Sequence, residues 1–144
     1  MIEPNREIKK PSEKREIMPR FEASALRGYC VSVLTASGVE RSCAEAVADA
    51  LIDAELTGVS THGVSRLAVY MQRMDAGVMS RENNIRIVRE STSTLVVDAG
   101  NSLGAAAAKF AMERCIAKAK ETGCCFASVH SSCLLYTSPS PRDA

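Results

Sequence analysis

The sequence predicts a mixed α/β fold, in which an N-terminal segment of three helices is followed by strands and one long helix. Apolar residues recur at three- and four-residue steps through residues 21–80, which is the period of an amphipathic helix. Beyond Gly77 the apolar residues alternate, as at Ile85 and Ile87, which is the period of a strand. This change of period separates a helical segment from the start of an α/β segment at 81–132.

The first two helices are predicted by apolar stripes that end at glycines. Gly38 follows the first stripe and Gly58 follows the second, and glycine is common directly after a helix. The second helix is also predicted to start with a capping box, in which the Ser42 hydroxyl and the Glu45 carboxylate satisfy exposed backbone N–H groups. The stripes consist of Leu26, Cys30, Val33 and Leu34, and of Ala46, Val47, Ala50, Leu51 and Ala54.

The third helix is expected to begin near His62 and to end at Gly77. His62, Arg66 and Tyr70 are spaced four residues apart, and in an α-helix this spacing keeps side chains on one face, turned by about 40° at each step. Three polar groups would then share one stripe. The alternative interpretation is an ordinary amphipathic helix whose polar outer face holds these groups.

The stripe has the chemistry of a site for a small organic acid. A guanidinium at Arg66 can grip a carboxylate through two parallel hydrogen bonds, and the positive end of a helix dipole beside it would add to the attraction. An imidazole can donate or accept a proton near neutral pH, so His62 could exchange one with an oxygen of the substrate. Tyr70 would hydrogen-bond the substrate or pack. A lone histidine at a helix start is more often a cap or surface group, so the assignment depends on its neighbours.

Two strands, a long helix and a further strand are expected after the helical segment. Leu95, Val96 and Val97 form a second apolar run beyond a polar break, so the two runs predict a hairpin or two neighbouring strands. The Ala-rich helix that follows is expected to end at Gly123. The continuous apolar run at 124–129 predicts a buried strand.

Two short patterns have both a functional and a structural interpretation. The glycines of GNSLG, residues 100–104, could cradle a phosphate, but their spacing is not that of G-x-G-x-x-G, which favours a turn that starts the long helix. His130 precedes two serines, but neighbouring side chains of a strand point to opposite faces. A catalytic Ser/His pair is therefore disfavoured there.

The composition argues against several classes of function. With 18 Lys and Arg against 17 Asp and Glu, the formal net charge is +1, so no overall field attracts nucleic acid or an anionic membrane. No apolar run approaches the roughly 20 residues that span a bilayer, and the N-terminus is charged where a signal peptide is apolar, so we expect a cytoplasmic protein. The six cysteines lack the paired C-x-x-C spacing of a zinc site and are expected to be reduced, with no metal bound.

The two ends of the chain differ from its middle. Residues 1–20 are rich in charge and proline and are expected to form a disordered tail, with Met18 as an alternative start of translation. Residues 133–143 resemble the translation of a widely used sequencing adapter, so 133–144 is expected to be a non-native tail. On that interpretation the natural sequence stops contributing at about Ser132.

The stretch DALIDAELTGVSTHGVSRLAVYMQRMDAGVMS resembles the N-terminal signature of a malate/L-lactate dehydrogenase family that is unrelated to the Rossmann-fold lactate dehydrogenases. The family includes ureidoglycolate, sulfolactate and cyclic-imine carboxylate oxidoreductases. Its pattern has an (S/T)-H-G-x-x-R segment with a Tyr four residues after the Arg. The resemblance covers 21–132, but Leu134 stands where the family has a second histidine. Further matches are Gly77-Val78, Val97-Asp98-Ala99, Leu103-Gly104, Ala119 to Gly123, and Val129 to Ser132.

The resemblance implies that the chain is a truncated part of a larger non-Rossmann NAD(P)-dependent oxidoreductase, a homodimer in its full-length form. Such enzymes transfer hydride between NAD or NADP and the 2-carbon of a small 2-hydroxy acid, such as malate or lactate, or of a cyclic imino acid. By this analogy Arg66 would hold the substrate carboxylate, His62 would assist proton transfer, and Thr61 and Tyr70 would be supporting contacts. The cofactor-binding residues stay unassigned, and which of the two family histidines is the main acid/base stays open. The chain by itself is expected to be inactive.

A second interpretation is a helix-turn-helix module that binds nucleic acid, with the third helix as its reader. That helix bears Arg66 and Arg73, and a reader helix should be basic on one face. The flanking helices are instead acidic, which favours the enzyme. Their acidic residues are Glu40, Glu45, Asp49, Asp53 and Glu55. Salt-dependent retention on DNA would distinguish the two functions.

Overall fold

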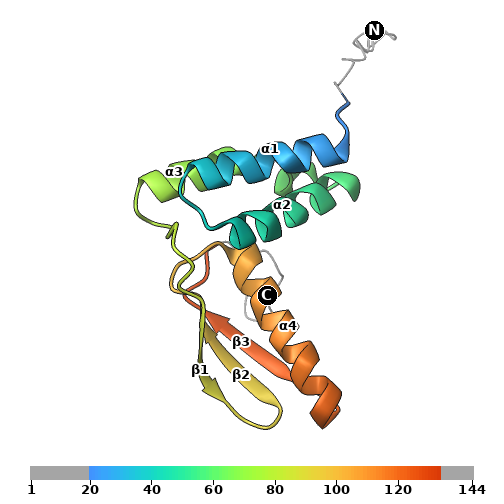
Figure 1. The fold of residues 1–144 in the computed structure, drawn as a ribbon, viewed down its shortest axis with the longest axis vertical. Coiled ribbons are helices and arrows are strands. Elements are labelled where there is room, and N and C mark those ends of the chain that lie inside the picture. The colour runs from blue at the N-terminus through green and yellow to red at the C-terminus, as the bar shows by residue number, and fades with distance from the viewer. Residues whose placement is uncertain (1–19, 134–144) are drawn as a thin grey trace, which may run out of the picture.

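The computed structural model describes residues 20–133, and the expectations for residues 1–19 and 134–144 lie outside it. Within the described part the expected mixed α/β class is confirmed, because three helices precede strands and a long helix (Figure 1). In chain order the elements are α1 (Ala23–Ala36), α2 (Arg41–Leu56), the short 3-10 turn η1 (Ser60–His62), α3 (Arg66–Asp75), β1 (Arg86–Glu90), β2 (Thr94–Asp98), α4 (Gly104–Thr122) and β3 (Phe126–His130).

A helical layer and a sheet are joined by α4. In Figure 1, α1, α2 and α3 lie together in the upper half, the sheet lies in the lower half, and α4 runs from the helices down alongside the sheet. The strand order is β1-β2-β3, with β1 antiparallel to β2 and β2 parallel to β3. The predicted hairpin is thus confirmed, and α4 is the crossover that the parallel pair requires. None of the helices in residues 20–133 has the length and apolar character needed to cross a membrane.

The core lies mainly between α1 and α2 and contains many small side chains. Leu34, Val47 and Leu51 are at most 2% exposed, and Ala44 and Ala48 are fully buried, which lets the two helices approach closely. The same hydrophobic cluster continues into α3, the start of α4 and the segment after β3 through Leu67, Met74, Leu103, Ala106 and Cys133. One core therefore anchors the start of α4 to the helical layer.

The helix ends are predicted correctly, whereas the capping box is wrong. The glycines that end the helices, Gly38, Gly58, Gly77 and Gly123, all have positive φ, between +70° and +91°. At the other end, α2 begins at Arg41 and has no side-chain cap. The Ser42 hydroxyl donates to the Glu40 carboxylate at 2.6 Å, and the Glu45 carboxylate accepts from Arg41 at 2.9 Å. Charged neighbours occupy both groups that would have capped the backbone.

The third helix, α3, begins at Arg66 and not near His62. His62 ends η1, and Gly63 follows in an extended conformation with φ −85° and ψ −152°. Because the helix does not run through this segment, the four-residue spacing does not place His62 on the helical face of Arg66 and Tyr70. The predicted stripe is wrong for His62 and correct for the other two, which lie one turn apart on α3.

The last strand, β3, forms as predicted but is exposed rather than buried. Phe126 is 70% exposed, and within the strand only Val129 is half-buried. β3 is an edge strand, and Val129 pairs with the buried Val97 on the face that α4 covers. An apolar run shows that a strand can be buried, but the neighbouring elements decide whether it is.

The GNSLG segment is a turn that starts α4. Gly100 and Asn101 have φ values of +54° and +59°, and Ser102 is 2% exposed. The Ser102 hydroxyl donates to the Glu82 carbonyl at 3.0 Å and accepts from the Asn84 N–H at 3.2 Å. These bonds tie the turn to the segment before β1. The Ser102 hydroxyl is bonded to main chain on both sides, which favours a structural turn over a phosphate cradle.

Candidate active site

Thr61 and His62 lie on the turn between α2 and α3, whereas Arg66 and Tyr70 lie on α3. Thr61 contacts both His62 and Arg66. The Thr61 hydroxyl lies 3.1 Å from His62 Nδ1, and the Thr61 carbonyl accepts a hydrogen bond of 2.6 Å from Arg66 Nε. The structure therefore groups Thr61, His62 and Arg66 through contacts to one residue, and not through a shared helical face.

The imidazole of His62 is exposed at the end of η1. Its Nδ1 pairs with the Thr61 hydroxyl, which can either donate or accept, while Nε2 makes no hydrogen bond within residues 20–133. A ring with one nitrogen held and the other open to solvent can pass a proton to or from a bound molecule. The Nε2 atom of His62 is therefore available to a bound molecule.

Arg66 is the first residue of α3, and its guanidinium is held at one corner. Because Nε is bound to the Thr61 carbonyl, the plane of the guanidinium is fixed. The two terminal nitrogens make no hydrogen bond to any part of the chain that the structure describes. Two parallel N–H donors match the two oxygens of a carboxylate. The terminal nitrogens of Arg66 are therefore available to a ligand that has two acceptor oxygens.

Tyr70 lies one turn after Arg66 and packs against the hydrophobic core. Burial raises the pKa of the Tyr70 phenol, and the positive charge of Arg66 acts in the opposite direction. The phenol therefore stays protonated at neutral pH and keeps a hydrogen to donate. Of the four predicted residues, Tyr70 is the one whose side chain belongs mainly to the core.

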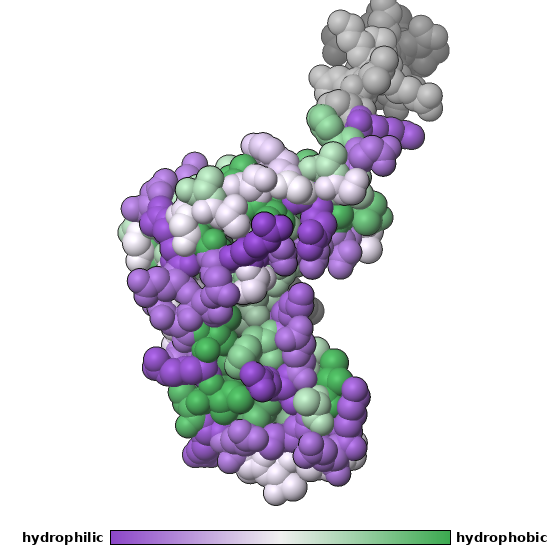
Figure 2. All heavy atoms as spheres, in the orientation of Figure 1, coloured by the Kyte–Doolittle hydropathy of each residue, from purple (hydrophilic) through white to green (hydrophobic). Residues whose placement is uncertain are grey.

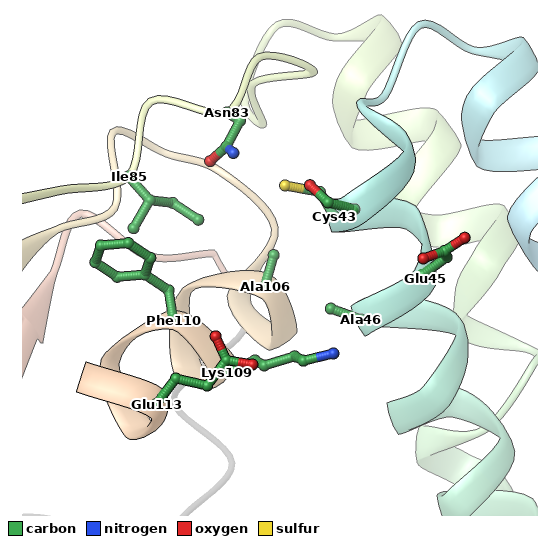
Figure 3. Close-up of a pocket in the computed structure, with 10 residues that line it drawn as sticks. Cys43, Glu45, Ala46, Asn83, Ile85, Ala106, Lys109, Phe110 and Glu113 are labelled. Carbon is green, nitrogen blue, oxygen red and sulfur yellow. The ribbon is translucent and has the colours of Figure 1, made fainter. Parts of the chain in front are cut away.

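Within residues 20–133, hollows border α2 on two sides, and neither His62 nor Arg66 lines these two. One, of about 270 Å³, lies between α2 and α4 (Figure 3). The other, of about 810 Å³, lies between the start of α1 and the end of α2 and is lined by Phe21, Leu56 and Glu55. His62 is exposed, and Arg66 is half-buried. The first hollow is lined by Ser42, Cys43, Glu45, Ala46, Asn83, Ile85, Ala106, Lys109, Phe110 and Glu113.

A second polar cluster, which the sequence analysis missed, lies at the carboxyl ends of β2 and β3. The Asp98 carboxylate accepts from Arg86 at 2.6 Å and from the Gly100 N–H at 3.0 Å, and His130 Nδ1 lies 3.8 Å from it. His130 also contacts the Ser131 hydroxyl at 3.0 Å, because Ser131 leaves the strand with φ +51°. The cluster forms because the parallel register of β2 and β3 pairs Asp98 with His130. This register cannot be read from the sequence.

This cluster predicts a pH-dependent stability. The Gly100 N–H and then the charges of Arg86 and His130 hold the pKa of the Asp98 carboxyl below its ordinary value of 3.8, against an opposing effect of burial. A carboxyl with a lowered folded-state pKa stabilises the fold above pH 3.8, and this contribution is lost as the pH falls through the lower folded value. We expect Asp98→Asn to lower the free energy of unfolding in urea at pH 7. The difference from the unchanged chain should shrink below pH 4, and a difference that is constant with pH would contradict the assignment.

Comparison with known proteins identifies the family. The family model described as malate/L-lactate dehydrogenase matches residues 21–135. The L-sulfolactate dehydrogenase of Methanothermobacter thermautotrophicus is 36% identical over 116 residues, which are 81% of this chain and 33% of that protein. The malate dehydrogenase of Pyrococcus horikoshii is 38% identical over 104 residues, which are 72% of this chain and 29% of that protein.

Solved structures agree with the sequence relatives. The structure of malate dehydrogenase from Pyrococcus horikoshii OT3 superposes with a TM-score of 0.76 at 35% identity, and covers 79% of this chain and 33% of that one. The sulfolactate dehydrogenase from Methanocaldococcus jannaschii superposes with a TM-score of 0.75 at 32% identity, over 77% of this chain and 32% of that one. The chain spans about a third of the length of the relatives that it matches. It belongs to the malate/L-lactate dehydrogenase family.

Proposed function

We propose that the chain provides the acid-binding part of an NAD(P)-dependent oxidoreductase that interconverts a small 2-hydroxy acid and its 2-oxo acid. In the oxidation, the 2-carbon gives a hydride to the nicotinamide and the hydroxyl gives a proton to a base. Arg66 holds the substrate carboxylate, and His62 takes the hydroxyl proton or returns it in the reverse reaction. Thr61 orients both groups, and Tyr70 supports the guanidinium from the core side.

The observation that carries this proposal is the pair of contacts at Thr61. They hold one nitrogen of His62 and one nitrogen of Arg66, and leave the reactive side of each group open. A carboxylate bound in the Arg66 fork would place the adjacent 2-carbon beside the turn that carries the imidazole. Relatives that are named malate or sulfolactate dehydrogenases support an acid of this class.

The dinucleotide is expected to bind outside residues 20–133. The glycine turn before α4 does not fit its phosphates, because its first three N–H groups are already bonded. Those of Gly100, Asn101 and Ser102 donate to the Asp98 carboxylate and to the carbonyls of Ser131 and Ala99. The described residues therefore account for the acid and the proton, and the nicotinamide supplies or accepts the hydride when it is bound. We also propose that the full-length enzyme is a homodimer. Met112 and Ile116 on α4 and Phe126 on β3 are exposed apolar side chains, which supports a further contact surface on these elements. Figure 2 shows apolar residues, in green, at the surface of the half of the molecule that holds the sheet and α4.

The test uses an enzyme in which residues 21–132 replace the matching segment of the Pyrococcus horikoshii malate dehydrogenase. We expect this chimera to oxidise NADH or NADPH in the presence of oxaloacetate, pyruvate or 3-sulfopyruvate, followed by absorbance at 340 nm. The 144-residue chain alone is expected to give no turnover, because it matches only about a third of its relatives. A folded chimera that reduces none of these acids would contradict the proposed function, and turnover by the chain alone would contradict its dependence on the rest of the enzyme.

A further inference from the structure

A carboxylate on α2 holds the turn that carries the candidate site. Glu55 lies in the last turn of α2, and its Oε1 accepts a hydrogen bond of 2.8 Å from the backbone N–H of Val64. Val64 is two residues after His62 and two residues before Arg66. Hydrogen bonds from a backbone N–H to a carboxylate are among the stronger ones in proteins. The contact therefore fixes the middle of the turn to a helix of the core.

Gly63 makes this contact sterically feasible. Gly63 is buried, and a Cβ atom built on it would overlap the Glu55 carboxylate. Its φ of −85° lies in the range that other residues adopt, so the requirement for glycine at this position comes from the neighbouring carboxylate and not from backbone strain. Glu55 and Gly63 are thus matched in shape. The glycine after His62 is explained by a residue on another element.

Backbone bonds hold the start of the turn to α2, because the N–H groups of Gly58 and Val59 donate to the carbonyls of Glu55 and Ala54 at 3.1 and 2.8 Å. Two further bonds fix the shape of the turn. Ser65 Oγ donates to the Ser60 carbonyl at 3.1 Å, and Arg66 Nε donates to the Thr61 carbonyl at 2.6 Å. Both lie inside the turn. Among residues 20–133, Glu55 is the side chain that hydrogen-bonds the turn from outside it. Loss of this bond would leave the start of the turn attached to α2 but would allow the segment around Val64 to move against that helix.

Glu55 also changes the electrostatics that the sequence analysis expected. The Glu55 carboxylate binds the N–H of Val64, two residues before α3 begins, so a negative charge already lies near the positive end of that helix. A substrate anion is then directed to the Arg66 guanidinium and away from the helix end. The position of the Glu55 charge and its close fit against Gly63 both indicate that Glu55 holds the turn in place.

We propose that Glu55 is a positioning residue that sets the placement of His62 and Arg66 through its bond to Val64 and its contact with Gly63. This inference depends on the proposed function for its catalytic meaning, whereas its structural part can be measured without any turnover. A positioning role predicts that the Val64 amide and the His62 ring respond together when Glu55 is changed.

The experiment is nuclear magnetic resonance on the full 144-residue chain, with circular dichroism to confirm folding. In Glu55→Ala we expect the Val64 amide to exchange with solvent about tenfold faster or more, and the His62 ring resonances to shift. Glu55→Gln keeps an acceptor oxygen and should restore part of the protection. Asp53→Ala, an exposed carboxylate on the same helix, is the matched control and should change neither signal.

A double-mutant cycle separates positioning from general destabilisation. Gly63→Ala should displace the Glu55 carboxylate and reproduce the Glu55→Ala spectrum, and the double variant should be no more perturbed than either single variant. Unchanged Val64 exchange and unchanged His62 resonances in folded Glu55→Ala would overturn the proposal, as would additive effects in the cycle. If the chimera described above has no activity but these spectra change as expected, the positioning of the turn holds and the proposed function fails.

Discussion

His62→Asn is expected to lower kcat for 2-oxo acid reduction by about 100- to 10,000-fold in the chimeric enzyme, which is the usual size of general acid–base catalysis. Asparagine can keep the hydrogen bond to the Thr61 hydroxyl that the imidazole makes, so the turn should keep its shape. Asparagine has no ring nitrogen that can take up and return a proton. KM for the acid should change little, because Arg66 still holds the carboxylate. Steady-state kinetics at 340 nm give both constants.

The control for this prediction is the second histidine of the sequence. His130 lies at the end of β3 beside Asp98 and not on the site turn, so His130→Asn should leave kcat nearly unchanged. An equal loss in both variants would point to general damage. A kcat for His62→Asn that matches the unchanged chimera would show that another group, such as the family's second histidine, transfers the proton.

Arg66→Lys is expected to raise KM for the acid substrate by about 10- to 100-fold, with a smaller effect on kcat. A lysine ammonium is a point charge that cannot offer two parallel N–H donors to a carboxylate. It also lacks the Nε that donates to the Thr61 carbonyl, so the fixed orientation of the charged group is lost. Loss of a charged hydrogen bond corresponds to about 1.5–3 kcal/mol, which gives this range of KM.

Arg89→Lys is the matched control for the fork. Arg89 lies on β1, is exposed and is far in sequence from the site turn, so its replacement should leave KM unchanged. An unchanged KM in Arg66→Lys would remove Arg66 from the acid site. A rise in KM for NADH in place of the acid would assign Arg66 to the cofactor.

The parts of the fold that depend on local sequence could be predicted, and the parts that depend on distant contacts could not. The helix ends at Gly38 and Gly77 follow from a residue that readily adopts positive φ. The start of α3 could not be read from the apolar period, because the turn before it is held by Glu55 from another helix. The exposure of Phe126 depends on which elements cover the edge strand β3, and the residues of the strand do not indicate which elements these are.

The candidate site shows the same division. The sequence identified Thr61, His62, Arg66 and Tyr70 by their residue types and by family resemblance, but it assigned His62, Arg66 and Tyr70 to one helical face. The structure groups Thr61, His62 and Arg66 through the Thr61 main chain and hydroxyl instead. The contact between Asp98 and His130 could not be predicted at all, since it needs the register of two parallel strands that α4 separates in the sequence.

The crossover through α4 also has a consequence for the order in which the molecule assembles. The helices α1 and α2 and the hairpin of β1 and β2 need only contacts between neighbours along the chain, and such contacts form early. The β2–β3 pair cannot close until all of α4 has left the ribosome, because β3 follows it. Until then the free side of β2 offers unpaired N–H and C=O groups, so we expect nascent chains to be most prone to aggregate in that interval.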